Sequence, residues 1–396
     1  MSLSEAQLLA DFQQRFFSPM TSPAPRAVGV ELELIPVIEF SRKPALAAKT
    51  TPILSALAHK HSWTERRDGN DPPSWLLRDG ARISFEPGGQ LEISSSPHAT
   101  AASVIRSTRE LVVLLKEAMQ HEGIELLANG VDPYNDIGVV PLQLRRPRYA
   151  GMTHYFDSIG PSGVRMMRQT AALQINVERG EDPHSRWQLL NAITPVVTAL
   201  FSNSSQYAGK KTNHASYRAH LWRTLDDSRT GIPYDESDPV RRYVDFALDA
   251  YAMQSGNAQH PYLTFREWMR AEKVGMEEWE FHLSTLFPEV RPKDYFEVRS
   301  ADTIDARFLA APVLFVASIV YDRESAQRTF EIVGTPNPDL LELAGVKGLA
   351  HPGLRRMARA LADIALDGAE SLGADYLSGD DVRIAAEYFD RVIPAT

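Results

Sequence analysis

Alternating carboxylates inside short apolar segments are the residues of this sequence best suited to chemistry. In the segment VGVELELIP, Glu31 and Glu33 occupy alternate positions, and Val30, Leu32 and Leu34 flank them. Because a β-strand directs alternate side chains to the same face, the two glutamates would point one way and the apolar side chains the other. Two carboxylates on one face of a strand predicted to lie in a core require a neutralising partner.

Three further segments show the same alternation of polar and apolar residues. The polar residues are Glu86 and Glu92 in FEPGGQLEIS, Gln174 and Asn176 in TAALQINVE, and Glu297 and Arg299 in DYFEVRSAD. The glycine pair between the first two residues can bend a strand or form a bulge. Four separate strands therefore each offer a polar face backed by an apolar one.

Two interpretations of these strands are open. An ordinary amphipathic sheet with its polar side in water explains each strand taken singly. A metal site explains them together, because the polar faces contain almost no lysine and the carboxylates stand among residues predicted to be buried. Carboxylate and amide oxygens are the ligands that Mg²⁺ takes, and a cation removes the repulsion between like charges.

The chemistry that such a site favours is phosphoryl transfer from ATP. Magnesium held by carboxylates usually also binds substrate phosphates. Arg299 shares a strand face with Glu297, and a guanidinium beside a metal-binding carboxylate can clamp a transferring phosphoryl group. The sequence has no Walker loop (G-x-x-x-x-G-K-[ST]), which excludes that mode of nucleotide binding. It also has no G-x-S-x-G elbow and no cysteine, so acyl-enzyme chemistry has no evident nucleophile.

Basic residues gather in the segment SNSSQYAGKKTNHASYRAHLWRTLDDSRTG, which contains Lys210, Arg218 and Arg229 among serine, asparagine and glycine. Its composition predicts a loop that leads into a short helix. A solvated surface loop and a substrate-binding loop whose cations pair with carboxylates fit this pattern equally well. A further basic residue, Arg168, stands just before the strand that carries Gln174.

The elements that must position these residues are short strands separated by helices. Strand patterns cover residues 27–35, 83–85, 90–94, 171–177 and 295–300, and helical periodicity covers residues 99–123, 187–203 and 351–366. Because the strands lack a regular strand–helix–strand repeat, we predict an α+β fold with a largely antiparallel sheet and outer helices. No polar linker interrupts the chain, so residues 1–396 are predicted to form a single domain.

Composition excludes several classes of partner and location. The 396 residues carry a net charge of -9, so no overall basic field attracts nucleic acid. The N-terminal segment lacks the basic start and apolar run of a secretory signal. The longest apolar stretch, residues 308–321, is shorter than the roughly 20 residues that span a bilayer, and it predicts a buried helix instead. We therefore expect a cytoplasmic protein that binds neither nucleic acid nor a membrane.

These motifs, in this order, resemble those of glutamate–cysteine ligases of the plant-type branch, which also occurs in many bacteria. The resemblance rests on VGVELEL, ISFEPGGQLEISSSP, MRQTAALQINV, the basic segment above, TFREWM and HLSTLFPEVRPKDYFEVRSAD. It implies a fold similar to the catalytic domain of glutamine synthetase, in which the concave polar face of a curved antiparallel sheet carries the active site and helices pack outside. It also implies that ATP drives the joining of glutamate to cysteine through a γ-glutamyl phosphate, giving γ-glutamylcysteine for glutathione synthesis.

The resemblance further implies roles for individual residues. Mg²⁺, or Mn²⁺ in its place, would be held by Glu31, Glu86 and Glu92 at one position and by Glu33, Gln174 and Glu297 near the phosphates of ATP. Arg299 would stabilise the γ-phosphate. Substrate carboxylates would be held by Arg168 and Arg218, with Arg229 and Lys210 as further candidates. The small-molecule substrates would be glutamate, cysteine and ATP, and the protein would be a monomer or a homodimer.

The sequence departs from the family pattern at Leu32, where the plant enzymes have histidine, and it lacks the cysteines that give those enzymes thiol–disulfide control. Two alternatives stay open: a ligase of the same fold that uses a different amine, and a glutamate–cysteine ligase that serves ergothioneine rather than glutathione synthesis. A non-enzymatic binding protein is disfavoured, because a decayed site has no physical reason to keep mutually repelling carboxylates.

Overall fold

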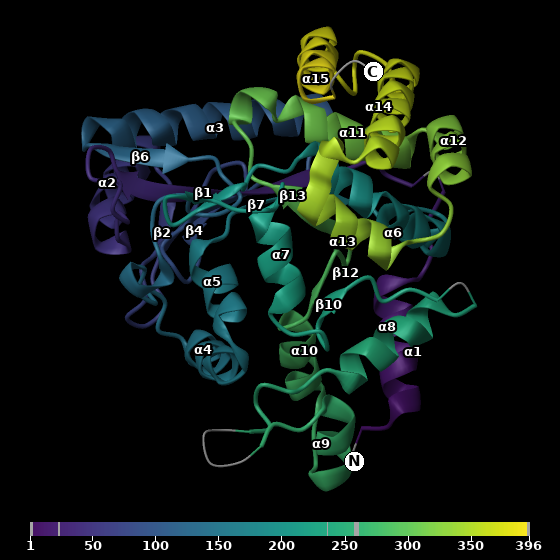
Figure 1. Cartoon of the computed structure of the whole chain (residues 1–396), viewed down its shortest axis with the longest axis horizontal. Helices are drawn as coiled ribbons and strands as arrows, with labels where there is room; N and C mark the ends of the chain where they lie inside the picture. The colour runs from purple at the N-terminus through teal and green to yellow at the C-terminus, as the bar shows by residue number, and fades with distance from the viewer. Residues whose placement is uncertain (1–2, 23, 236, 257–260, 394–396) are drawn as a thin grey trace.

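A nine-stranded sheet organises the computed structural model, which describes residues 3–22, 24–235, 237–256 and 261–393 (Figure 1). Its strands lie in the order β12-β13-β7-β1-β5-β4-β3-β2, and β6 pairs with the second half of β1. All pairings of this sheet in the described residues are antiparallel, which confirms the predicted α+β fold with a curved, largely antiparallel sheet. The strands are β1 (Val28–Ile38), β2 (Thr64–Arg66), β3 (Ser74–Leu76), β4 (Arg82–Phe85), β5 (Leu91–Ser94), β6 (Ile124–Leu127), β7 (Ala172–Val177), β12 (Val290–Pro292) and β13 (Phe296–Asp302).

One face of the sheet is apolar and carries the core. Val30, Leu32 and Leu34 of β1 are buried on this face, and Ile175 of β7 continues it. Three helices cover the face: α3 (Ala101–His121) packs on β1, α6 (Pro183–Leu200) on β13, and α11 (Ala310–Tyr321) on β7. Because each strand directs its remaining side chains the other way, burial of the apolar face places the polar residues together on the opposite one.

Helix α11 is the buried helix that the apolar stretch at residues 308–321 predicts. Every residue of the helix except Tyr321 is buried. Helices α14 (Pro352–Leu372) and α15 (Gly379–Val392) pack on its outer side at the top of Figure 1. An all-apolar helix is typical of such a position between two layers. No helix in the described residues is long and apolar enough to cross a membrane.

A second group of helices covers the polar face. Helices α4 (Pro147–Ile159), α5 (Pro161–Gln169) and α7 (Tyr217–Thr224) lie below the sheet in Figure 1, and α5 packs against the other two. The helix predicted to follow the basic loop is α7. The remaining helices are α1 (Glu5–Phe16), α2 (Ala47–His61), α8 (Pro239–Asp249), α9 (Phe265–Ala271), α10 (Met276–Ser284), α12 (Arg323–Val333) and α13 (Pro338–Lys347).

The predicted strands and helices all appear in the structure, with shifted ends. The structure also contains several short elements that the sequence did not predict. Strands β2, β3, β6 and β12 have only three or four residues, too few for an alternation to stand out. The two-stranded pairs β8–β9 (Gln206–Tyr207, Lys210–Lys211) and β10–β11 (Thr230–Gly231, Phe287–Pro288) are shorter still. The organisation of residues 1–396 as one domain stays a prediction.

Candidate active site

The strand register places the predicted polar residues side by side on one face. Glu33 of β1 lies directly opposite Glu92 of β5, and Glu31 lies opposite Gln174 of β7. Strand β13 pairs with the other edge of β7 and adds Glu297 to the same region. Like charges that face each other across strands are destabilising, so the sheet holds this cluster at an energetic cost.

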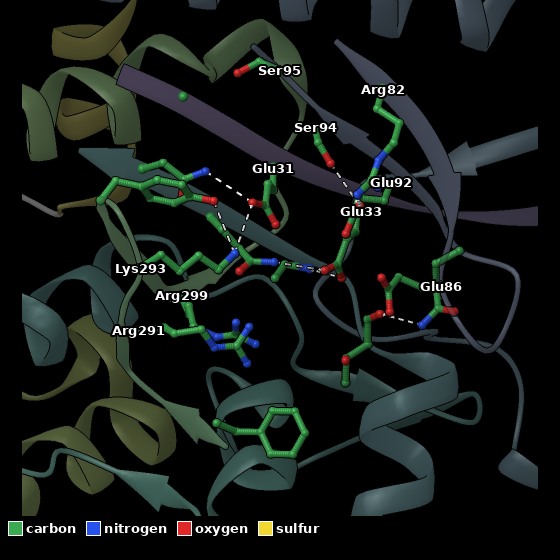
Figure 2. A pocket seen from close by; sticks show the side chains of 18 of the residues that line it. Glu31, Glu33, Arg82, Glu86, Glu92, Ser94, Ser95, Arg291, Lys293 and Arg299 are labelled. Atoms are coloured by element: carbon green, nitrogen blue, oxygen red, sulfur yellow. Dashed lines mark hydrogen bonds and ion pairs between the residues drawn. The ribbon is translucent and has the colours of Figure 1, made fainter. Parts of the chain in front are cut away.

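A cavity of about 790 Å³ lies between this polar face and helices α4, α5 and α7. In Figure 2, the carboxylates of Glu33, Glu86 and Glu92 lie on one side, and the guanidinium groups of Arg291 and Arg299 lie together on the other. The predicted site residues that line the cavity are Glu31, Glu33, Glu86, Glu92, Gln174, Arg218 and Arg299. Two ion pairs bridge this division, since Arg82 lies 3.6 Å from Glu92 and Lys293 lies 3.9 Å from Glu31. The gathered guanidinium groups suit an anionic ligand that meets them directly and meets the carboxylates through a metal ion.

Burial makes the glutamates of this cavity hard to ionise. It raises the pKa of Glu31 and of Glu33 to about 7, and the charge of neighbouring glutamates adds to the effect. The pKa of Glu86 lies well above its ordinary value for the same reasons, with Glu92 and Glu33 as the nearby charges. Lys293 lies 3.9 Å from Glu31 and offsets the rise only in part. The cluster would therefore gain stability from any bound cation.

The oxygen chemistry of the cluster fits a divalent cation. The side-chain oxygen Oε1 of Gln174 is buried without a hydrogen-bond partner, beside carboxylates that repel one another. No three acidic or histidine side chains in the described part of the chain stand grouped as metal ligands. Glu33 accepts the backbone N–H of Ala172 at 2.7 Å, and Glu92 accepts two serine hydroxyls at 3.0 Å each. A carboxylate has about four lone-pair sites, so a metal ion could share these oxygens with the groups that donate to them.

Glu297 differs from the other glutamates because it is buried among cations and does not line the cavity. Its carboxylate lies 2.6 Å from Nη1 of Arg299 and 3.5 Å from Nη1 of Arg291, and it forms a further ion pair with Lys293. Burial opposes its ionisation, but the three cations outweigh burial and lower its pKa to about 2. Glu297 thus stands behind three basic residues that themselves line the cavity.

Buried contacts hold Arg218 and Arg299 in place at the wall of the cavity. Nη2 of Arg218 donates to the backbone carbonyl of Arg299 at 2.8 Å, and the buried carboxylate of Asp302 lies 3.8 Å from its Nη1. Both guanidinium carbons lie near the ring of Trp222, at 4.9 and 5.1 Å from its centre, a range in which cation–π attraction is favourable. Trp222 is itself anchored, since its Nε1 donates to the carbonyl of Phe287 at 2.9 Å. These contacts preorganise two like charges at one wall of the cavity.

Three residues predicted to hold substrate lie outside this cavity. Lys210 is exposed in β9, and Arg229 is fully buried elsewhere. Arg168 lines a separate cavity. It belongs to helix α5, so the strand alternation that aligns Gln174 with the sheet face does not extend to it. Of the four predicted basic substrate residues, the structure brings only Arg218 to the site.

Arg229 is instead the centre of a buried network. Its Nε lies 2.6 Å from Asp226, its Nη groups donate to the carbonyls of Thr285 and Tyr251, and its guanidinium lies over the ring of Tyr155. These contacts tie the segment after α7 to α4 and to the segment after α10. The arrangement indicates a structural role.

We expect Arg229→Ala to lower the free energy of unfolding by about 3–5 kcal/mol, because it leaves the carboxylate of Asp226 buried without its partner. Urea denaturation measures the change. The matched control is Arg241→Ala, which breaks an exposed ion pair with Asp238 and should cost less than about 1 kcal/mol. Equal losses in the two variants would contradict the structural role of Arg229.

Several basic residues of the site escape prediction from sequence. Arg291 and Lys293 line the cavity from the β12–β13 hairpin, Arg148 comes from α4 and Arg82 from β4. The signal for the first two was their position in RPKDYFEVRS, within six residues of Glu297. Arg82 has a similar signal, because it stands four residues before Glu86 in RISFE. Arg148 lies in a segment that shows no comparable signal, and only the packing of α4 around the cavity identifies it.

The fold and the site define a class of protein: an α+β enzyme whose antiparallel sheet carries a deep cavity with opposed acidic and basic walls. Residues 27–348 match the model of a family described as glutamate–cysteine ligase family 2. The chain therefore belongs to glutamate–cysteine ligase family 2, a family of ligases.

Two curated relatives agree with this assignment, and one solved structure shares the fold. The chloroplastic glutamate–cysteine ligase of Medicago truncatula is 30% identical over 371 residues, which are 87% of this chain and 72% of that protein. The corresponding enzyme of Arabidopsis thaliana is 30% identical over 374 residues, which are 87% of this chain and 70% of that protein. The solved structure of a glutamate–cysteine ligase from Francisella tularensis, in complex with AMP, has a TM-score of 0.53 at 13% identity and covers 95% of this chain and 83% of that one. This last likeness is one of fold.

Proposed function

We propose that this protein is an ATP- and Mg²⁺-dependent ligase that joins the γ-carboxylate of L-glutamate to the amine of L-cysteine. The reaction would proceed through a γ-glutamyl phosphate and give γ-glutamylcysteine, ADP and phosphate. The observation that carries the proposal is the cavity in which carboxylates stand opposite a wall of arginines, in a chain that belongs to a family of glutamate–cysteine ligases.

The basic wall would bind the nucleotide phosphates. Arg291, Lys293 and Arg299 present three cations to the cavity, and a wall of fixed positive charge stabilises the charge that spreads over a transferred phosphoryl group. Glu297 would act through them, because its ion pairs fix their positions. Its role as a direct metal ligand, which the family resemblance implies, stays a prediction.

The acidic wall would hold magnesium. Glu31, Glu33, Glu86 and Glu92 supply carboxylate oxygens, and Gln174 supplies a buried oxygen that has no other partner. When bound, Mg²⁺ would screen the phosphates from the incoming carboxylate of glutamate. The presence of Mn²⁺ in its place stays a prediction from the sequence.

Arg218 would bind a substrate carboxylate, since it is buried, fixed by Asp302 and open to the cavity. The helices over the polar face support the same chemistry, because an acyl phosphate must be kept from water. Met166 and Met167 of α5 line the cavity and are buried, so the helix side is partly apolar. A cytoplasmic location and a monomeric or homodimeric state stay predictions from the sequence.

The test is the release of ADP from the purified protein with ATP and Mg²⁺. We expect slow release with glutamate alone, faster release when cysteine is added, and γ-glutamylcysteine as the product in mass spectrometry. Omission of glutamate and chelation of Mg²⁺ are the controls, and each should abolish the cysteine-dependent rate. If cysteine gives no turnover while another amine in a panel does, the assignment of the amine is wrong.

A further inference from the structure

A second cavity, of about 840 Å³, opens beside α5 and shares no lining residue with the first. Its walls come from the segment after β1, from the segment at residues 135–141, and from α4 and α5. Its lining residues include Lys43, Leu46, Val139, Val140, Asp157 and Arg168. The volume lies in the range of small-molecule sites.

The walls of this second cavity expose apolar side chains to solvent. Leu46 is 39% exposed and Val139 is 58% exposed, and both line the cavity. Ile137, Val140 and Val164 extend the apolar surface. A single exposed hydrophobic residue needs no explanation, but two that converge with other apolar side chains on one concavity are typical of a binding site.

Arg168 gives the cavity a charged end. One of its Nη groups donates to the carbonyl of Val140 at 3.2 Å, and its Nε is buried without a hydrogen-bond partner. Lys43 adds a second cation, whereas Asp157 is the single acidic residue of the lining. The lining of the cavity thus carries a net positive charge, which favours one anionic group on the ligand.

The second cavity is linked to the turn that carries Glu86. Gln143, which follows the cavity wall at residues 137–141, donates its backbone N–H to the carbonyl of Pro87 at 2.7 Å and its side-chain amide to the carbonyl of Gly88. A Cβ at Gly88 would lie only 1.9 Å from the carbonyl oxygen of Arg168, so the turn and the end of α5 are in direct backbone contact. A shift of the segment at residues 135–141 or of the end of α5 would therefore move the turn that carries Glu86.

We propose that the second cavity is an effector site for a small molecule with an apolar body and one anionic group. The ligand contacts Arg168 through its anionic group, covers Leu46 and Val139 with its apolar body, and alters the position of Glu86 through Gln143 and Gly88. The binding site stands on the geometry of the cavity alone, whereas the effect on catalysis rests on the proposed function.

Binding is tested on the full chain with the fluorescent anion 1-anilinonaphthalene-8-sulfonate in the presence of saturating ATP and Mg²⁺, which occupy the first cavity. We expect a saturable fluorescence increase that octanoate reverses and octan-1-ol reverses less well. Arg168→Gln, which removes the charged donor, and Val139→Glu, which adds a like charge at an exposed wall position, should each weaken dye binding about tenfold or more. The matched control is Arg106→Gln on the exposed side of α3, which should bind the dye as the wild type does. Equal affinity in all four proteins would overturn the proposed site.

The effect on the first cavity is tested with the Mg²⁺ concentration that gives half-maximal ADP release. We expect octanoate to change this concentration at least about threefold in the wild type and to have no effect in Val139→Glu, whose turnover without octanoate should match the wild type. Dye binding that follows the pattern above with unchanged Mg²⁺ dependence would keep the site and overturn its role as an effector site. A protein without glutamate- and cysteine-dependent turnover would refute the proposed function, and the dye titration would still decide the binding site.

Discussion

Glu33→Gln is expected to abolish ligase turnover and, at pH 8, to make the ligand-free protein more stable than the wild type. The carboxylate of Glu33 is buried opposite Glu92, and burial, with the charge of Glu92, raises its pKa from the ordinary 4.5 to about 7. Glutamine keeps the oxygen that accepts the N–H of Ala172 but carries no charge. Turnover should fall more than about 100-fold, since even outer-shell partners of a metal site are worth 10–100-fold.

The sign of the stability effect follows from proton binding. Between about pH 4.5 and pH 7, the folded state holds a proton on Glu33 that the unfolded state has lost, so the stability of the wild type falls as the pH rises through this window. Glutamine has no such loss. At pH 8, the free energy of unfolding of the variant should therefore exceed that of the wild type by about 3 kcal/mol, since one pKa unit corresponds to roughly 1.4 kcal/mol. Most of this difference should vanish at pH 5.

Urea denaturation at the two pH values, with and without Mg²⁺, measures this effect. Mg²⁺ should stabilise the wild type at pH 8 and stabilise Glu33→Gln much less. The control is Glu117→Gln on the exposed side of α3, for which neither stability nor turnover should change. A Glu33→Gln variant that is less stable than the wild type at pH 8 would show that the folded protein benefits from the charge, contrary to this prediction.

Glu297→Gln is expected to be inactive for a different reason and to be less stable than the wild type. The low pKa of Glu297 means that the folded state gains from its charge above about pH 4.5. Removing that charge leaves Arg291, Lys293 and Arg299 close together without their shared carboxylate. Loss of one partner from a buried ion-pair cluster typically costs about 3–5 kcal/mol.

Nucleotide binding separates this ion-pair role from a general loss of stability. ATP would bring negative charge to the three cations, so it should raise the melting temperature of Glu297→Gln more than that of the wild type. The matched control is Glu289→Gln, which removes a buried carboxylate that pairs with Arg223 outside the cavity lining. That variant should lose stability without any added response to ATP. Glu297→Gln that melts like the wild type without nucleotide would refute the ion-pair role.

The opposite signs of these two predictions come from tertiary structure alone. Glu33 and Glu297 occupy equivalent positions in the sequence pattern, each on the polar face of an alternating strand. The fold buries Glu33 opposite Glu92, with Arg218 and Arg299 offsetting the rise in its pKa only in part, and it pairs Glu297 directly with two arginines and a lysine. Alternation specifies the face on which a side chain lies, but the charges around it depend on which strands and hairpins become neighbours.

The sequence by itself determined the strands that carry the carboxylates and the polar face that each of them presents. Alternation is a local property of an extended chain, so it places Glu31 and Glu33 on one face of β1 and Leu32 on the other. The long apolar stretch of α11 requires a buried helix wherever it lies in the fold. The order of the motifs was also sufficient to identify the family. Local pattern determines which residues are presented together within one element.

Apart from Arg299, which strand alternation places beside Glu297, only the tertiary structure decided which cations join the site. Arg218 reaches the cavity, whereas Arg168 faces a second cavity and Arg229 is buried in a structural network, although all three are basic residues close to recognised motifs. Arg291, Lys293 and Arg148 enter the site through a hairpin and a helix that pack around the polar face. The physical reason is that a long basic side chain gives no periodic signal of its own, and its partner is set by contacts between elements far apart in the chain.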